Sequence, residues 1–403
     1  MANTNIKIAV ITSSRADYGH LYWPLKHLVQ SDNCDLRIIA FAAHLSHEFG
    51  NTVEQIRKDG FAVEECVECL LSSDSDVGMA KTIGMATLGL ADVLGRLRPD
   101  LLLIIADRYE MLAPACVATA LRIPIAHIEG GEVSEGAIDN IVRNALTKLS
   151  HIHLTPTATA MQRVLNMGEE AWRVHCVGTP SLDHLRSSAL ASRAELEQSL
   201  KLKIAGSATV VSYHPVTMYE DSLRETMALF AALESIDRQI IFCFPNADAG
   251  SRELICRARE FCKASGHRHL FVNLEPRMYW SLLRQADLMV GNSSSGIMES
   301  PSIPLPCVNI GIRQRGRERA KNIIDAEPDK KAILAAIDRA SDPTFRAALD
   351  GLSNPYGDGR AGERIAKILL NVETGEKLLF KQTVNNEILD RRDKGSADEV
   401  SAT

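Results

Sequence analysis

Short apolar runs alternate with longer segments of helical periodicity along most of the chain. Residues 6–12, 36–42 and 101–106 are short, apolar and bounded by polar residues, as is typical of strands buried in a parallel sheet. Residues 79–97 predict a long helix between two such runs. Repeated alternation of strands and helices indicates an α/β protein with a doubly wound parallel sheet.

A second series of strands and helices begins near residue 210, after a polar, lysine-rich helical segment that we expect to bridge two domains. Residues 306–310 are the last clear strand of this series. Beyond residue 371, charged and small residues dominate, which favours disorder. We expect a first Rossmann-like domain over residues 1–183, a second over residues 184–370, and a charged, disordered tail over residues 371–403.

Composition narrows the class of protein. Of the 403 residues, 45% are hydrophobic and 24% charged, as in a soluble globular protein, and the net charge of -6 disfavours nucleic-acid binding. No apolar run approaches the roughly 20 residues of a membrane helix, and the N-terminus lacks a signal peptide, so we expect a cytoplasmic protein without a membrane partner. Nine cysteines include one CxxC pair, Cys66 and Cys69, where a zinc ribbon needs two.

The stretch 101–150 carries the densest candidate chemistry. Two predicted strands end there in charged residues: Asp107 and Arg108 follow one, and Glu129 and Glu132 follow the other. In open α/β sheets, ligands bind beyond the carboxyl ends of the strands. Asp139 then opens a helix next to this edge. Crowded carboxylates repel, so at least one should hold a proton more tightly, which suits acid–base catalysis near neutral pH.

A plainer interpretation of this stretch stays open. Asp107 with Arg108, and Asp139 with Arg143, are close enough in sequence to form ordinary local ion pairs.

Several further residues are candidates for binding an anion. Arg15 lies at a strand-to-helix turn, and the loop GNSSSG at 291–296 precedes a helix, where backbone N–H groups favour phosphate. Arg313 begins a basic run, His214 ends a strand, and Glu299 could accept hydrogen bonds from ribose hydroxyls. The alternatives are a surface arginine near a helix cap for Arg15, an ordinary capped turn for the loop, and a solvated face for the basic run. For His214 the alternative is a structural role, and for Glu299 a favourable contact with the helix dipole.

Several sequence motifs resemble those of the hydrolysing UDP-N-acetylglucosamine 2-epimerase family. This family includes the bacterial enzymes of the sialic-acid pathway and the epimerase half of the bifunctional animal enzyme. From Ser13 to Ala361 the motifs are SSRADYG, ADRYE, HIEGGEVSEGAID, LTKLS, SYHPVT, GNSSSG, NIGIRQRGRERAKN and SNPYGDGRA. The resemblance implies a GT-B fold, in which two Rossmann-like domains hold the active site between them and the second binds the nucleotide.

The resemblance also implies a reaction. UDP leaves UDP-N-acetylglucosamine as the C2 proton is removed, and water then adds to the resulting glycal. The products are N-acetylmannosamine and UDP, which feed sialic acid biosynthesis, and neither a metal nor another cofactor is needed. The family further suggests a homodimer or homotetramer.

Position by position, the resemblance assigns catalytic roles to Asp107, Glu129, Asp139 and His214. The residues it assigns to UDP and sugar binding are Arg15, His44, Arg108, Ser293, Ser294, Gly296, Glu299 and Arg313.

Two departures from the family pattern stand out: Ala106 replaces a frequent glycine, and Asn144 replaces a frequent histidine. The word HVEAGLRT of the non-hydrolysing enzymes is absent, which favours hydrolysis. A sister hydrolysing enzyme, acting on UDP-2,4-diacetamido-2,4,6-trideoxy-glucose in the legionaminic acid route, is the alternative. A GT-B glycosyltransferase and a non-catalytic nucleotide-sugar sensor are the remaining alternatives.

Overall fold

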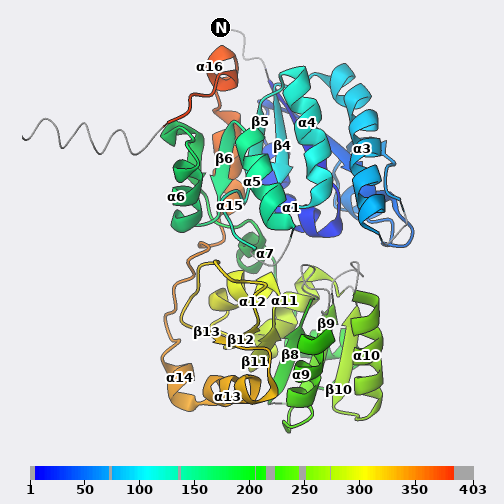
Figure 1. Cartoon of the computed structure of the whole chain (residues 1–403), viewed down its shortest axis with the longest axis vertical. Coiled ribbons are helices and arrows are strands. Elements are labelled where there is room, and N and C mark those ends of the chain that lie inside the picture. The colour runs from blue at the N-terminus through cyan, green and yellow to red at the C-terminus, as the bar shows by residue number, and fades with distance from the viewer. Residues whose placement is uncertain are drawn as a thin grey trace, which may run out of the picture.

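The computed structural model describes residues 5–71, 75–134, 138–204, 206–214, 223–244, 251–272 and 274–384. Figure 1 shows two lobes stacked along the long axis, each built on a sheet that is flanked by helices.

Parallel strands form the sheet of the first lobe. Within the described residues it has seven strands, in the order β3-β2-β1-β4-β5-β6-β7. Their bounds are Ile6–Thr12 (β1), Cys34–Phe41 (β2), Val63–Val67 (β3), Leu101–Ile105 (β4), Ile125–Ile128 (β5), Ile152–Thr155 (β6) and Val174–Cys176 (β7). The strand order reverses between β1 and β4, and ligands bind at such a switch point.

The second lobe repeats this plan. Its described strands are also all parallel and have the order β10-β9-β8-β11-β12-β13, so the order reverses between β8 and β11. Their bounds are Ala208–Ser212 (β8), Gln239–Phe244 (β9), Arg268–Val272 (β10), Leu288–Gly291 (β11), Cys307–Ile310 (β12) and Ile323–Ala326 (β13). The prediction of an α/β fold with two doubly wound domains is confirmed. The edge strand β13 was missed, because its sequence IIDA has only two adjacent apolar side chains before an exposed aspartate.

Helices connect the strands and cover both sheets. The α-helices are Arg15–Val29 (α1), Val53–Lys58 (α2), Asp76–Leu97 (α3), Leu112–Leu121 (α4), Asp139–Leu149 (α5), Ala158–Asn166 (α6), Ser181–Ser187 (α7), Arg193–Leu200 (α8), Leu223–Leu233 (α9), Ser251–Lys263 (α10), Pro276–Gln285 (α11), Ser294–Met298 (α12), Lys330–Ser341 (α13), Pro343–Ala347 (α14), Ala361–Leu370 (α15) and Glu376–Leu379 (α16). Short 3-10 turns occupy Ala42–Leu45, Tyr109–Met111, Ala171–Arg173 and Ser300–Ser302.

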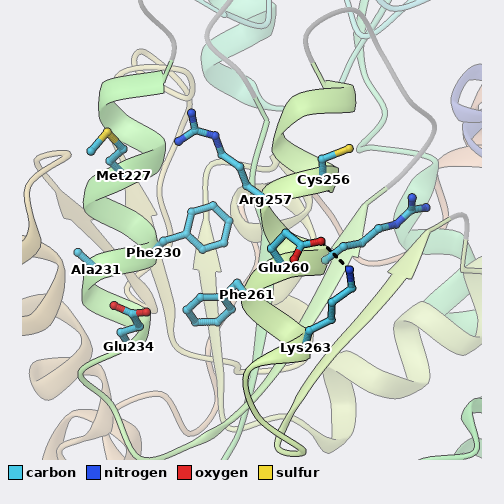
Figure 2. Close-up of a pocket in the computed structure, with 10 residues that line it drawn as sticks. Met227, Phe230, Ala231, Glu234, Cys256, Arg257, Glu260, Phe261 and Lys263 are labelled. Atoms are coloured by element: carbon cyan, nitrogen blue, oxygen red, sulfur yellow. Dashed lines mark hydrogen bonds and ion pairs between the residues drawn. The ribbon is translucent and has the colours of Figure 1, made fainter.

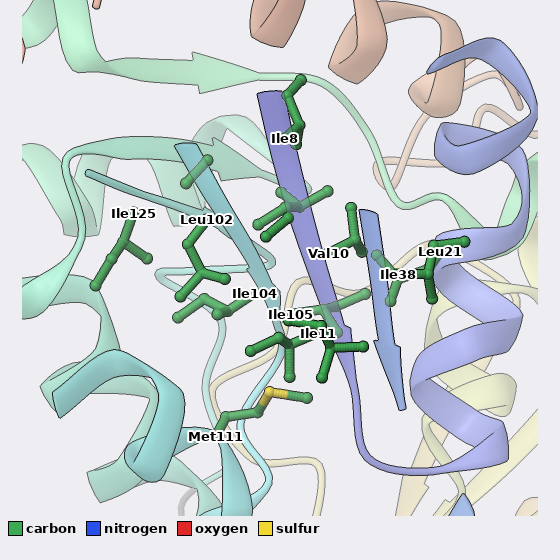
Figure 3. Packing of buried hydrophobic residues seen from close by; sticks show 14 of the residues in the cluster. Ile8, Val10, Ile11, Leu21, Ile38, Leu102, Ile104, Ile105, Met111 and Ile125 are labelled. Atoms are coloured by element: carbon green, nitrogen blue, oxygen red, sulfur yellow. The ribbon is translucent and has the colours of Figure 1, made fainter. Parts of the chain in front are cut away.

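Buried aliphatic side chains hold the first lobe together. Figure 3 shows Ile11 of β1 and Ile105 of β4 next to Met111, with Val10 and Ile8 further along β1, and each of these side chains is fully buried. Burying such a side chain is worth about 2 kcal/mol. The strand ends next to the switch point are therefore rigidly placed.

The C-terminal segment corrects the predicted domain boundaries. Ile365 and Leu369 of α15 belong to the core of the first lobe, although residues 361–370 were expected in the second domain. Asp183 fixes the start of α15 by accepting hydrogen bonds from the backbone N–H groups of Ala361 (2.9 Å) and Gly362 (2.6 Å). The chain therefore crosses back to the first lobe after α14.

The segment after α15 also packs on the first lobe, as far as residue 384. Leu378 is fully buried in its core, and the buried Arg173 donates hydrogen bonds to the carbonyl oxygens of Lys377, Leu378 and Phe380. The expectation of disorder is therefore wrong for residues 371–384. Residues 385–403 lie outside the described part of the chain.

Among the described residues, helix α3 is long and apolar enough to cross a membrane by length and composition alone. Leu90 and Leu94 are nevertheless fully buried in the core of the first lobe, and α3 lies beside α4 on one face of the sheet. Its apolar character is therefore used in packing on the sheet.

Candidate active site

Glu129 follows β5 in a tight turn that directs its side chain towards α1. Its φ of +67° and that of Gly131, +80°, are left-handed, and a Cβ atom on Gly131 would lie 2.2 Å from the carbonyl oxygen of Ala160. The turn therefore requires glycine at position 131. It brings Oε1 of Glu129 within 2.8 Å of Nδ1 of His20 and 2.7 Å of Oγ1 of Thr179.

These contacts determine the ionisation of Glu129. Burial would raise its pKa, but the charge of His20 and the hydrogen bonds from His20 and Thr179 lower the pKa to about 2. Burial would likewise lower the pKa of His20, while Glu129 raises it to about 9. Around neutral pH the two side chains form an ion pair.

Asp107 follows β4, and its carboxylate pairs with the buried guanidinium of Arg143 on α5. Arg143 also donates to Oγ of Ser134 (3.3 Å), whereas its Nε and Nη1 have no hydrogen-bond partner within the described residues. The alternative of local pairs holds in neither form: Asp107 pairs with Arg143 instead of Arg108, and Arg108 lies 3.2 Å from Glu110, two residues further on. The helix after Asp139 therefore supports the tip of β4.

Asp139, the first residue of α5, faces cations from both lobes. Burial raises the pKa of its carboxyl group, while the charges of Arg313, Arg108 and Arg317 oppose that increase. A carboxyl group with a raised pKa beside several cations can accept and return a proton.

Glu132 joins the two lobes. Its Oε2 lies 3.5 Å from Nε of Arg317 and accepts a 3.4 Å hydrogen bond from the hydroxyl of Tyr356. Arg317 also donates to the carbonyl oxygen of Val133 (3.0 Å). Burial raises the pKa of Glu132. In the basic run from Arg313 to Lys321, Arg317 thus faces the first lobe, whereas Arg315 is exposed.

Asn292 organises the facing edge of the second lobe. Its Oδ1 accepts from the backbone N–H of His214 (2.7 Å), and its Nδ2 donates to the carbonyl oxygen of His214 (2.8 Å). Its own carbonyl oxygen accepts from Arg313 (3.0 Å). Burial and the charge of Arg313 lower the pKa of the His214 imidazole to about 3, so this ring is neutral.

The loop 291–296 reaches the same edge through a strained turn. Gly291 has a φ of +147°, and a Cβ atom there would lie 1.9 Å from the carbonyl oxygen of Ser212. Ser293 caps α12 by accepting a hydrogen bond from the N–H of Ser295 (3.4 Å), and Ser294 is the first residue of the helix. Gly296 is buried, and a Cβ atom there would lie 2.7 Å from Sγ of Cys307, so packing accounts for this glycine.

The remaining predicted residues lie around the switch points. Nη2 of Arg15 donates to the carbonyl oxygen of Leu274 in the second lobe (2.6 Å), and the buried Glu299 has a pKa raised by burial. His44 is fully buried, with its ring nitrogens 2.9 Å from Oγ1 of Thr12 and 2.8 Å from Oγ1 of Thr52. Burial and Arg108 lower the pKa of His44 to about 3. Both of its ring nitrogens are occupied by protein partners.

Sequence reasoning missed four residues that connect the site: His20, Thr179, Asn292 and Tyr356. His20, Asn292 and Tyr356 carry a local signal, since His20 follows the motif SSRADYG, Asn292 lies within GNSSSG and Tyr356 lies within SNPYGDGRA. Asn144 is exposed, so it takes no part in this network.

Two other features bear on where ligands bind. Within the described ranges, no group of three or more His, Cys, Asp or Glu side chains could hold a metal ion. A groove of about 700 Å³ lies between α9 and α10, over Phe230 and Phe261, with Arg257 and Lys263 at its rim (Figure 2). None of the predicted site residues lines this groove.

Two Rossmann-like domains of GT-B-like arrangement, with charged strand ends facing each other, define the class of this protein. Its structure is similar to that of UDP-GlcNAc 2-epimerase from Neisseria meningitidis bound to UDP-GlcNAc, with a TM-score of 0.77 at 16% identity, covering 91% of this chain and 100% of that chain. The sequence profile described as UDP-N-acetylglucosamine 2-epimerase matches residues 26–370. The chain belongs to the UDP-N-acetylglucosamine 2-epimerase family, as its sequence words indicated.

Similar sequences refine this placement. One is the GDP/UDP-N,N'-diacetylbacillosamine 2-epimerase (hydrolyzing) of Campylobacter jejuni, 36% identical over 80% of this chain and 84% of that protein. Another is the UDP-N,N'-diacetylbacillosamine 2-epimerase (hydrolyzing) of Legionella pneumophila, 35% identical over 93% and 98%. The UDP-N-acetylglucosamine 2-epimerase of Neisseria meningitidis is 31% identical over 91% and 96%.

Proposed function

We propose that this protein is a hydrolysing 2-epimerase that converts UDP-N,N'-diacetylbacillosamine and water to UDP and the free C2 epimer of the sugar. The sequence words favoured UDP-N-acetylglucosamine as the substrate. The relatives named for the diacetylated sugar are 36% and 35% identical, against 31% for the N-acetylglucosamine enzyme. They support the alternative substrate instead, the UDP-linked 2,4-diacetamido-2,4,6-trideoxy sugar.

The observation that carries the reaction type is the charge pattern around Asp139. Its carboxyl group faces Arg108 of its own lobe and Arg313 of the other, and burial raises its pKa. An enzyme that eliminates a diphosphate needs a proton acceptor for C2 next to cations for the leaving group. We assign these roles to Asp139 and to the two arginines.

In the first step, Asp139 accepts the C2 proton while the C1–O bond breaks and its electron pair leaves with UDP. The C1=C2 double bond of a glycal forms. Positive charge that develops at C1 is stabilised by the anions Glu129 and Asp107, of which Glu129 has a pKa lowered to about 2. The neutral His214 ring donates a hydrogen bond to the departing diphosphate.

In the second step, water adds to the glycal. A second carboxylate of the first lobe removes one proton from the water as its oxygen bonds to C1. An acid on the face of the ring opposite Asp139 gives C2 a proton that comes from solvent, and Asp139 releases to solvent the proton that it took. One water is consumed, so UDP and the free sugar balance the substrate. No atom or electron is required from a metal or another cofactor.

The second lobe supplies the nucleotide contacts in this proposal. Ser293, Ser294 and the backbone at the start of α12 bind the diphosphate, and Arg15 approaches it from the first lobe. Glu299, buried at the end of α12, accepts hydrogen bonds from the ribose hydroxyls.

The test compares initial rates of nucleotide release, without an acceptor sugar, for four substrates: the UDP and GDP forms of diacetylbacillosamine and of N-acetylglucosamine. We expect the highest kcat/KM for UDP-N,N'-diacetylbacillosamine. Faster release from UDP-N-acetylglucosamine would restore the first hypothesis. Turnover only when an acceptor is present would identify a glycosyltransferase, and tight UDP binding with no turnover a nucleotide-sugar sensor.

The setting of the activity is also proposed. The free amino sugar would feed the legionaminic acid route in the cytoplasm, or sialic acid biosynthesis if N-acetylglucosamine is the substrate. We further propose a homodimer or homotetramer, because Leu88 of α3 and Ile141 of α5 are 75% and 67% exposed. A monomer in light scattering would contradict this part.

A further inference from the structure

His20 of α1 has no role in the reaction as proposed so far, although it touches one of the proposed catalytic carboxylates. Its Nδ1 lies 2.8 Å from Oε1 of Glu129, and the side chains are 27% and 10% exposed. Position 20 lies 109 residues before Glu129 in the sequence. The contact therefore depends on the tertiary fold, which places the first turns of α1 beside the end of β5.

Two hydrogen bonds meet on the same oxygen of Glu129. The hydroxyl of Thr179 donates to Oε1 over 2.7 Å, and Nδ1 of His20 approaches the same atom from α1. No side chain or backbone group in the described part of the chain bonds to Oε2. The carboxylate is thus fixed through one oxygen, and its other oxygen is open to a ligand.

The surroundings of His20 favour its charged form. Four titratable groups from different elements face it: Asp17 on α1, Glu129 after β5, Glu299 at the end of α12 and His184 on α7. Three of them are acids. Burial would lower the pKa of His20, but these acids raise it to about 9, so both ring nitrogens carry protons at neutral pH.

We propose that His20 is a positioning residue that fixes Oε1 of Glu129 and supplies the positive charge which keeps this carboxylate ionised. Oε2 then faces the sugar as an anion throughout the reaction. Because an ionised and anchored Glu129 is a poor proton carrier, other groups must remove the C2 proton and deliver the new one. This inference rests on the proposed function for its role in catalysis, but the ion pair itself does not.

The first test needs no substrate. Protein labelled with ¹⁵N-histidine is titrated by long-range ¹H–¹⁵N NMR, and His20 is assigned by the signal lost in His20→Asn. We expect His20 to remain doubly protonated at pH 8 and to become neutral at that pH in Glu129→Gln. A neutral His20 in the wild-type protein at pH 7, or no change in Glu129→Gln, would overturn the proposal.

The second test measures the pH dependence of turnover. Asn at position 20 keeps an N–H donor near the place of Nδ1 but removes the charge, so we expect kcat to fall about 100-fold and the acid limb of the profile to move to higher pH. Thr179→Val removes a hydrogen bond but no charge, so it should lower kcat less and leave the limb in place. His267→Asn, at an exposed position in the second lobe, is the matched control.

The two tests distinguish a failure of the positioning role of His20 from a failure of the proposed epimerase function. An unchanged profile in His20→Asn would refute the positioning role even if the enzyme is an epimerase. If the wild-type protein turned over none of the nucleotide sugars, the proposed function would fail, and the NMR titration would still decide whether His20 holds Glu129 ionised.

Discussion

The two strand edges that face each other at the site differ in how they are built. The first lobe contributes carboxylates, each held by a distant partner: Glu129 by His20 and Thr179, and Asp107 by Arg143. The second lobe contributes a backbone turn at Gly291, with a φ that favours glycine, and the cation Arg313. Arg313 donates a hydrogen bond to the carbonyl oxygen of Asn292, the residue after Gly291. The proposed reaction thus assigns proton transfer to ionised groups of the first lobe, and nucleotide binding to the shape and charge of the second.

Substitution of Asp139 is the most severe test of the proton transfer that we propose for the first lobe. Asn has nearly the same shape but cannot carry a proton, so we expect Asp139→Asn to lower kcat about 1,000-fold while KM changes little. Steady-state kinetics on the preferred nucleotide sugar measure this. Asp338→Asn, at an exposed position on α13, is the control, and a mainly KM effect of Asp139→Asn would contradict the assignment.

The His20–Glu129 pair predicts a pH-dependent stability. The raised pKa of His20, about 9 against 6.5, stabilises the folded state below pH 6.5, and this stability is lost as pH rises through 9. The lowered pKa of Glu129, about 2 against 4.5, stabilises it above pH 4.5, and this is lost as pH falls through 2. The pair therefore contributes fully between pH 4.5 and 6.5.

Removing the charge of His20 should accordingly cost about 3 kcal/mol of unfolding free energy near pH 5.5, because it leaves the buried Glu129 without its charged partner. Urea unfolding of the wild type and His20→Asn at several pH values measures this difference. We expect it to shrink above pH 9. A difference that is the same at pH 5.5 and pH 10 would indicate lost packing instead of a lost charge pair.

Gly291 tests the backbone of the second lobe. Alanine there would place its Cβ atom against the carbonyl oxygen of Ser212 in a conformation that favours glycine, so Gly291→Ala should destabilise the protein by about 2 kcal/mol or more. Chemical denaturation measures the change, together with UDP affinity, which should also fall. Gly266→Ala, where a Cβ atom meets nothing within 4 Å, should change neither.

Arg313 tests the charge of the same edge. Its loss should weaken UDP binding by about 2 kcal/mol, the range of hydrogen bonds to charged groups, with a smaller effect on kcat. Calorimetric titration of Arg313→Gln with UDP measures this, and Arg315→Gln, at the exposed neighbouring arginine, is the control. Equal losses from both substitutions would mean that only the overall charge of the basic run matters.

The smallest expected effect concerns Ala106, between β4 and Asp107. Ala106 stands where the family often has glycine. Its φ is +58°, a left-handed conformation that costs a residue with a side chain about 1 kcal/mol. Ala106→Gly should therefore raise the unfolding free energy by roughly that amount. A loss of stability would show that packing of the methyl group outweighs the strain.

Sequence patterns predicted the sheets well, because strands such as β1 and β4 are buried on both faces and read as continuous apolar runs. They also brought Asp107 and Glu129 to one edge, since parallel strands end on the same side. The docking of α15 and α16 on the first lobe escaped prediction, because it is fixed by contacts such as Asp183 with Gly362, 179 positions apart. The partners of the carboxylates escaped for the same reason.

The central claim is that carboxylates of the first lobe move the C2 proton, while Arg108 and Arg313, one from each lobe, stabilise the departing UDP. The most direct measurement is proton NMR of the reaction with UDP-N,N'-diacetylbacillosamine in D2O, without metal or acceptor. We predict free UDP and a C2-epimerised sugar that carries deuterium at C2. Release of UDP with the original proton retained at C2 would mean simple hydrolysis, and would contradict the roles proposed for Asp139 and Glu129.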